Sequence, residues 1–101
     1  MIKNIKTSIT GTTSTAITSV AAGSVGVIFS IAICNTGTVS TNITLNLGAS
    51  HTLISAVPLP AGETFIYSTK LVVNASEVLN VLSSTATPLF ATVSMDELAQ
   101  A

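Results

Sequence analysis

The side chains that could perform acid–base chemistry are few and widely spaced. The chain carries only four carboxylates, Glu63, Glu77, Asp96 and Glu97. Two carboxylates that work as an acid and a base must come within about 5–10 Å of each other in a cleft. Glu63 and Glu77 both lie in turn-forming segments, which favours solvated positions, and nothing in the spacing brings any pair together. We therefore predict no catalytic carboxylate pair.

His51 and Cys34, the single histidine and the single cysteine, are the candidates for metal or nucleophilic chemistry. A zinc site needs three or four His, Cys or carboxylate ligands, which this pair cannot supply. We predict that His51 is a surface or interface residue. Cys34 cannot form an intrachain disulfide, and no cationic neighbour in sequence would activate its thiol, so it is predicted to pack as a small residue.

Serines are plentiful, so a Ser-His-Asp triad stays formally open. The Gly-x-Ser-x-Gly elbow that would expose a nucleophile is missing from the sequence, and so is a glycine-rich phosphate loop. We predict no catalytic, cofactor-binding or metal-binding residues, no cofactor, and a protein that is not an enzyme.

The composition favours a protein that associates with other chains. Of its 101 residues, 48% are hydrophobic and only 7% are charged, so few charges keep copies apart. Lys3, Lys6 and Lys70 are the only basic residues, which is too few for the phosphate contacts of nucleic-acid binding or for an anionic membrane surface. No targeting segment is visible, so we expect synthesis in the cytoplasm.

The segment 25–34 is predicted to be the central strand of the fold. At a period of two, its bulky apolar residues share one face, and small residues dominate the other. The bulky face is formed by Val25, Val27, Phe29, Ile31 and Ile33. The turn that follows, at Asn35–Thr38, is expected to use Gly37 for a positive φ.

Other segments also alternate as strands do. Segment 41–47 is predicted to pair with the central strand, and 12–20 is predicted to be half-exposed; 51–55 and 64–67 are predicted to be short strands, and 97–100 could form a helical turn. Ile43, Leu45 and Leu47 are expected to face inward. In the last strand, Leu89, Ala91, Val93 and Met95 are expected to share one face, and so are Phe65 and Tyr67 in theirs.

The strand spacing predicts an all-β fold: a single antiparallel β-sandwich, jelly-roll or immunoglobulin-like, of about seven or eight short strands. We divide the chain into an N-terminal arm or edge strand (1–11), a β-sandwich domain (12–97) and a C-terminal tail (98–101).

Successive stretches of the chain follow a known order of turns and strands. They are Val20-Ala21-Ala22-Gly23-Ser24, a strand that closes in Ile33-Cys34-Asn35-Thr36, Val57-Pro58-Leu59-Pro60-Ala61-Gly62-Glu63-Thr64, Lys70-Leu71-Val72-Val73-Asn74 and Glu77-Val78-Leu79-Asn80-Val81. This order resembles the small β-sandwich virion structural proteins of tailed bacteriophages, from about Thr12 to Glu97. The chain departs from that pattern at Ala22, where the family has proline, and at Ser76-Glu77, where it has Gly-Asp.

The resemblance implies a non-enzymatic virion structural protein, and a head decoration or cement protein in first place. It implies the major capsid protein or other virion proteins as partners, and a homo-oligomer with a trimer favoured. The location it implies is the virion, the head in preference to the tail. Two alternatives stay open: a tail, neck or fibre-associated module, and a carbohydrate-binding or pilus-like binding domain.

Overall fold

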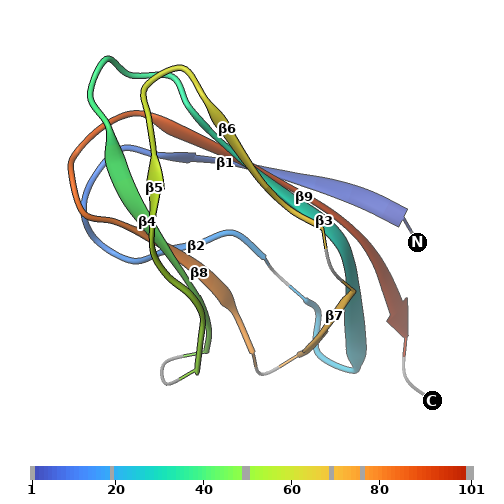
Figure 1. Cartoon of the computed structure of the whole chain (residues 1–101). Helices are drawn as coiled ribbons and strands as arrows, with labels where there is room; N and C mark the ends of the chain where they lie inside the picture. Colours follow the sequence, from blue (N-terminus) through green and yellow to red (C-terminus); the bar gives the residue numbers. More distant parts are fainter. Residues whose placement is uncertain (1, 19, 49–50, 69, 76, 100–101) are drawn as a thin grey trace.

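A computed structural model shows nine strands and no helix in the part of the chain that it describes, residues 2–18, 20–48, 51–68, 70–75 and 77–99 (Figure 1). The strands are β1 (Ile2–Ile9), β2 (Thr15–Ala16), β3 (Ser24–Asn35), β4 (Thr41–Leu47), β5 (His51–Leu59), β6 (Thr64–Tyr67), β7 (Leu71–Asn74), β8 (Leu79–Ser83) and β9 (Leu89–Ala99).

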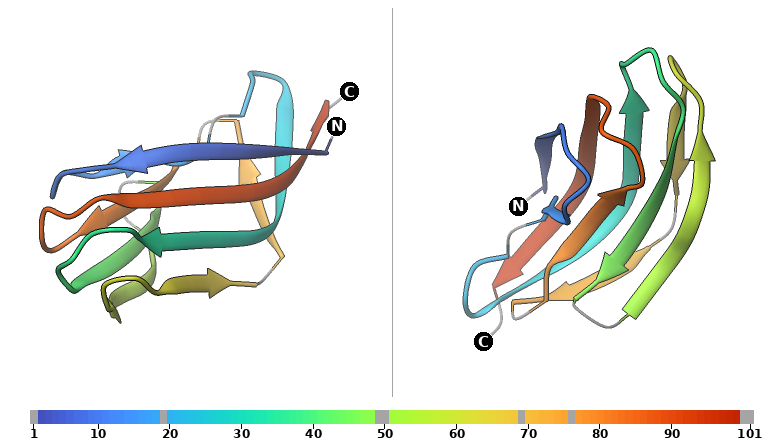
Figure 2. Two further views of the ribbon diagram at one scale, coloured as in Figure 1. Left: turned by 90° about the horizontal axis from the view of Figure 1, so that it is seen from above. Right: turned by 90° about the vertical axis from the view of Figure 1, so that its left-hand side faces the viewer.

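The strands form two antiparallel sheets that pack face to face. The first sheet has the order β1-β9-β3-β6, with β7 also paired to β3, and the second has the order β2-β8-β4-β5. Figure 2 shows the first sheet from its broad side, with β1, β9, β3 and β6 running next to one another. The predicted all-β antiparallel sandwich is confirmed.

The pairing is nested: the first strand pairs with the last, the second with the one before the last, and so on toward the middle of the chain. β1 pairs with β9, β2 with β8, β3 with β6 and β7, and β4 with β5. Such a folded-over double strand, wrapped into two sheets, is the jelly roll and not the immunoglobulin arrangement. β6 and β7 lie along the same β3 strand, at Ile31–Cys34 and Val25–Ile28, so together they fill one of the eight jelly-roll positions.

The structure corrects the prediction for the central strand. β3 contains a β-bulge halfway along, and the residues that point inward change from even-numbered to odd-numbered there. Ile28 is opposite Met95 and Ser30 is opposite Ser94, which leaves Phe29 as the extra residue. Before the bulge, Ile28 points into the core; after it, Ile31 and Ile33 do. The five bulky residues therefore do not share a face, and Phe29 is 45% exposed.

The structure confirms the alternation predicted for β4, but not its predicted pairing with the central strand. Ile43 and Leu45 are fully buried and Leu47 packs against the core, while Asn42 is exposed. β4 pairs with β5 and β8, however, and β3 belongs to the other sheet. The chain crosses between the sheets at residues 36–40, so the expected hairpin between β3 and β4 is wrong. Periodicity fixes the side that a residue faces, not the strand beside it.

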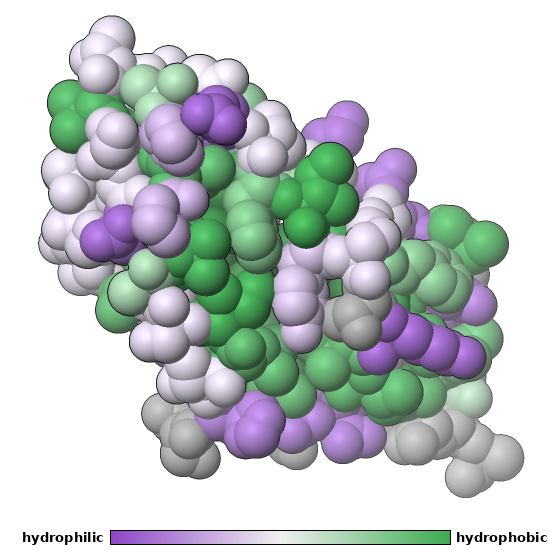
Figure 3. Space-filling model, in the orientation of Figure 1, coloured by the Kyte–Doolittle hydropathy of each residue, from purple (hydrophilic) through white to green (hydrophobic). Residues whose placement is uncertain are grey.

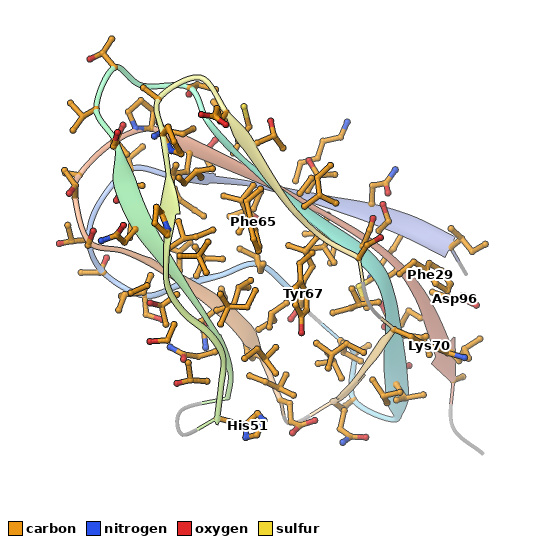
Figure 4. All side chains as sticks on the ribbon, in the orientation of Figure 1. Phe29, His51, Phe65, Tyr67, Lys70 and Asp96 are labelled. Carbon is orange, nitrogen blue, oxygen red and sulfur yellow. The ribbon has the colours of Figure 1, made fainter. Side chains whose placement is uncertain are left out.

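The core lies between the sheets and is partly open along the edge where β5 faces β6 and β7 (Figure 3). Figure 3 shows hydrophobic side chains in a band between the two sheets on this side, and Figure 4 shows Phe65 and Tyr67 pointing into the space between them. The buried core consists of Ile9, Ile17, Ile28, Ile31, Ile33, Ile43, Leu45, Leu59, Val73, Leu79, Val81, Leu89, Ala91, Val93 and Met95. The shared faces predicted for the last strand and for Phe65 with Tyr67 are confirmed, and the structure shows that the last-strand face points into the core.

Several predicted boundaries change. The half-exposed strand over 12–20 shrinks to β2, and Ile17 after it is buried, as is Thr18, whose hydroxyl accepts a hydrogen bond from Leu79 N at 2.9 Å. The strand expected at 51–55 extends as β5 to Leu59. The helical turn expected at 97–100 is wrong for 97–99, because β9 continues to Ala99; residues 100–101 of the predicted tail lie outside the described part.

Asn35 ties together the loops at one end of the sandwich. Its side chain is fully buried at the end of β3. The amide Nδ2 donates to Val39 O at 2.9 Å and to Leu59 O at 3.1 Å, and Oδ1 accepts from Gly37 N at 3.0 Å and from Thr87 Oγ1 at 3.3 Å. One side chain thereby links β3, the 36–40 crossover, the end of β5 and the segment before β9.

Gly37 is required at this end of the fold for a reason other than the predicted one. It does not have the expected positive φ; the glycines that do are Gly23, Gly48 and Gly62. A Cβ at position 37 would instead lie 2.9 Å from Pro88 Cδ and closer still to Thr87 Oγ1. The segment before β9 packs directly on this backbone, so only hydrogen fits there.

Candidate functional site

The side chains that the sequence offered as candidates for chemistry lie apart from one another in the fold. His51 is exposed at the start of β5, and Glu63 is exposed in the turn between β5 and β6. Cys34 is a half-buried free thiol on β3. Within the described residues, no three His, Cys, Asp or Glu side chains come together as a metal site would require. No helix in that part of the chain is long and apolar enough to span a membrane.

Glu77 has a local structural role. One oxygen of its carboxylate, Oε1, accepts hydrogen bonds from Asn74 N at 3.1 Å and from Asn74 Nδ2 at 2.9 Å. These bonds close the turn between β7 and β8, together with the bond from Glu77 N to Asn74 O at 2.9 Å. The turn position predicted for Glu77 is correct, and its carboxylate serves the backbone.

Glu97 fastens the start of β1 to the end of β9. Its Oε1 pairs with Lys3 Nζ, and its Oε2 accepts a hydrogen bond from Ala21 N at 3.0 Å. The hydrogen bond from Lys3 and then that from Ala21 hold the pKa of Glu97 below its ordinary value of 4.5. Sequence reasoning placed Glu97 near the C-terminus but missed this contact, because its partners lie 94 and 76 residues away.

The Glu97 contact predicts a pH dependence of stability. Because the folded-state pKa is lowered, its stabilising contribution is fully present above the unfolded-state pKa and is lost as pH falls through the folded-state value. When the pH is lowered from 6 to a value below 4.5, we expect the free energy of unfolding to fall less for Glu97→Gln than for the wild type. Urea unfolding at both pH values measures this, with Glu63→Gln as the control at an exposed turn. Equal losses in wild type and Glu97→Gln would contradict the assignment.

A small open hollow lies at the end of the second sheet. It has a volume of about 260 Å³ and is lined by hydroxyls, one amide and two prolines: Ser40, Thr41, Asn42, Pro58, Pro60, Ser84 and Thr85. The Thr41 hydroxyl within it is already engaged with Ser83 Oγ at 2.7 Å. None of the lining side chains is charged or aromatic, so the hollow offers mainly hydroxyl and amide groups for hydrogen bonding.

The outer side of the first sheet carries the largest group of exposed apolar side chains. Inward residues alternate with outward ones along each strand, so the outward set follows from the buried set. We define the apolar face by its large exposed residues, which come from every strand of this sheet: Ile2, Phe29, Ile66, Val72, Phe90 and Leu98. Figure 4 shows Phe29 on this side, opposite to Phe65 and Tyr67.

The strand register places the exposed apolar residues in groups toward the two ends of this face. Phe90 lies opposite Cys34, and Ala32 lies opposite both Thr92 and Ile66. At the other end of the sheet, further outward pairs continue the surface; they are Val25 with Leu98 and Val27 with Val72. Lys6 and Asp96 also project from this face, and the polar residues Asn4, Thr92 and Ser94 lie between the two apolar groups.

The second sheet differs, because its outward positions are mostly polar. On β4 these positions are Asn42, Thr44 and Asn46; on β8 they are Asn80 and the half-buried Leu82. The other exposed large apolar residues of the described chain are Val39 and Val78, which lie outside the strands. The two sheets therefore present outer surfaces of opposite character, and the apolar face is the candidate site. Composition predicted that such a surface exists, but it could not place it.

Comparison with known proteins identifies the fold alone. No protein-family model and no curated protein matches this chain in sequence. A chain in the structure of infectious bursal disease virus, Gx strain, aligns over 98% of this chain with 11% identity and a TM-score of 0.50. A subunit of the Bacillus endospore appendages, described as a family of disulfide-linked pili, aligns over 99% with 16% identity and a TM-score of 0.48.

The two neighbours differ in how much of their own length this chain matches. It spans 32% of the viral chain and 89% of the appendage chain. At 11% identity, the viral likeness concerns the fold alone and does not transfer a binding partner.

Proposed function

We propose that this chain is a non-enzymatic structural subunit of a virus particle. The observation that carries the proposal is the apolar face, where six large exposed apolar side chains project from one sheet while the other sheet is mostly polar on its outside. Exposed apolar patches of this kind mark surfaces that are covered by a partner. The jelly-roll fold, found in viral capsid domains, is consistent with this role.

Within that class, we propose a head decoration or cement protein of a tailed phage, with the major capsid protein as its partner. The turn-and-strand resemblance to phage virion proteins supports this specific role. A cement protein acts by burying surface across subunit boundaries, and whatever binds only the assembled shell stabilises it by mass action. An interface of about 1,200–2,000 Å² is sufficient for a specific contact, and repetition over a shell multiplies weak contacts.

The test compares variants that remove apolar groups on and off the apolar face. Ile66→Ser combined with Phe90→Ser should weaken binding to particles depleted of this chain at least tenfold, because each buried apolar side chain contributes about 1.5–3 kcal/mol. Val39→Ser is the matched control, since Val39 and Phe90 are both 50% exposed but Val39 lies in the 36–40 crossover. Sedimentation of particles with labelled chain measures the binding.

Unchanged binding of the double variant would contradict the proposed use of this face. Cryo-electron microscopy of the particle separates head from tail or neck attachment. Glycan-array binding that depends on Ser84 or Asn42 would instead favour the carbohydrate-binding alternative, which the hydroxyl-lined hollow supports.

A further inference from the structure

The four sheet edges are protected against strand pairing to different degrees. β2 has two residues, and β6 and β7 have four each. β5 is longer, but it contains Pro58 and a positive φ of 50° at Ala56, and its register with β4 shifts twice. Short strands, prolines and bulges are the usual features that prevent an edge from pairing with another chain.

β1 has none of these features. It pairs with β9 in one uninterrupted register from Ile2–Asp96 to Ile9–Leu89. Its other side is the edge of the first sheet, where backbone N–H and C=O groups face away from β9. Lysine is a further common edge protection, but Lys3 is held by Glu97. Lys6 is then the only charged side chain on the outward face of β1.

We propose that β1 pairs antiparallel with β1 of a second copy of this chain, so that the first sheets of two subunits form one continuous sheet. A two-fold axis perpendicular to a sheet keeps inward side chains on the inward side, so paired residues must lie on the same face. Even-numbered residues of β1 face outward and odd-numbered residues inward, so the numbers of paired residues sum to an even value.

The lysines and the length of the paired segment together select one register among these. A sum of 6 places Lys3 opposite Lys3 of the partner subunit, and a sum of 12 does the same for Lys6; like charges directly opposite are destabilising. A sum of 8 joins only residues 2–6, and a sum of 14 joins only residues 5–9. A sum of 10 joins residues 2–8, places Ile5 opposite Ile5 of the partner subunit, and sets Lys6 opposite Asn4 of the partner subunit.

This pairing goes beyond the proposed particle role and does not depend on it. It uses the edge of the sheet, whereas particle binding uses the apolar face. The two apolar faces would also become one surface, because both lie on the same side of the joined sheet. An assembly built from such dimers would present twice the apolar area to a common partner.

The register makes position 4 the decisive site for a test. Asn4→Glu places a carboxylate opposite Lys6 of the partner subunit twice per dimer, and Asn4→Lys places a like charge there. We expect Asn4→Glu to tighten dimerisation by about three- to tenfold and Asn4→Lys to weaken it by a similar factor. Ser8→Glu is the matched control, because it makes the same charge change on the same strand face but lies opposite Ile2 of the partner subunit.

Sedimentation-velocity titration of the full chain measures the dissociation constants. Ile66→Ser with Phe90→Ser should leave the dimer constant unchanged, which separates edge pairing from association through the apolar face. A chain that remains monomeric at every concentration would overturn the proposal, as would equal effects of Asn4→Glu and Ser8→Glu.

Discussion

Replacing Asn35 with aspartate is expected to lower the free energy of unfolding by about 3–5 kcal/mol, a large share of the 5–15 kcal/mol typical of a domain. The substitution keeps the shape and the acceptor oxygen but removes the Nδ2 donor. Val39 O and Leu59 O then lose their partner and face a second oxygen in a fully buried site. An unmet buried group costs about 1–3 kcal/mol, and a buried charge costs more.

The same substitution should make stability depend on pH. Burial among carbonyl oxygens favours the neutral carboxyl and raises its folded-state pKa above the unfolded value. The destabilisation is therefore smallest below the unfolded-state pKa and grows as pH rises toward the folded-state pKa. Asn42→Asp, at an exposed position, is the control and should change stability by less than about 0.5 kcal/mol. Urea unfolding at several pH values reads both effects. A loss for Asn35→Asp no larger than the control's would show that the loops do not depend on this amide.

The bulge in β3 makes opposite predictions for two adjacent residues. Ile28→Ala should cost about 2–5 kcal/mol, because Ile28 is fully buried opposite Met95. Phe29→Ala removes a larger side chain but should cost less than about 1 kcal/mol in the isolated chain, because Phe29 lies on the apolar face. Urea unfolding of both variants at low protein concentration measures the difference. Strict alternation along 25–34 predicts the reverse order. A larger loss of stability for Phe29→Ala than for Ile28→Ala would therefore contradict the bulge at Phe29.

The sequence was sufficient to predict the fold class and several strand faces, because local alternation records which side chains are buried. The Ile43–Leu47 and Leu89–Met95 patterns were read correctly because those stretches keep their period on the core side. The bulge at Phe29 was not predictable, since one inserted residue leaves an apolar run that still looks regular. Its position follows from the pairing of β3 with β9, which is distant in sequence.

The candidate surface was predictable in kind but not in place. Low charge indicated a surface that associates, yet its residues come from strands at both ends of the chain, from Ile2 to Leu98. Only the nested pairing brings them onto one sheet. Asn35 was read as a turn residue for a related reason, because the groups that it binds lie as far along the chain as Thr87. Local sequence does not show such a contact.

Cys34 provides the most direct measurement of whether the apolar face is buried in an assembled particle. It is the single cysteine and lies on that face opposite Phe90. Maleimide labelling should be at least tenfold slower in the particle than in the free chain. In a Cys34→Ser background, a cysteine introduced by Asn42→Cys on the polar sheet should label at similar rates in both states. Equal labelling of Cys34 in particle and free chain would contradict the claim that this face holds the subunit in place.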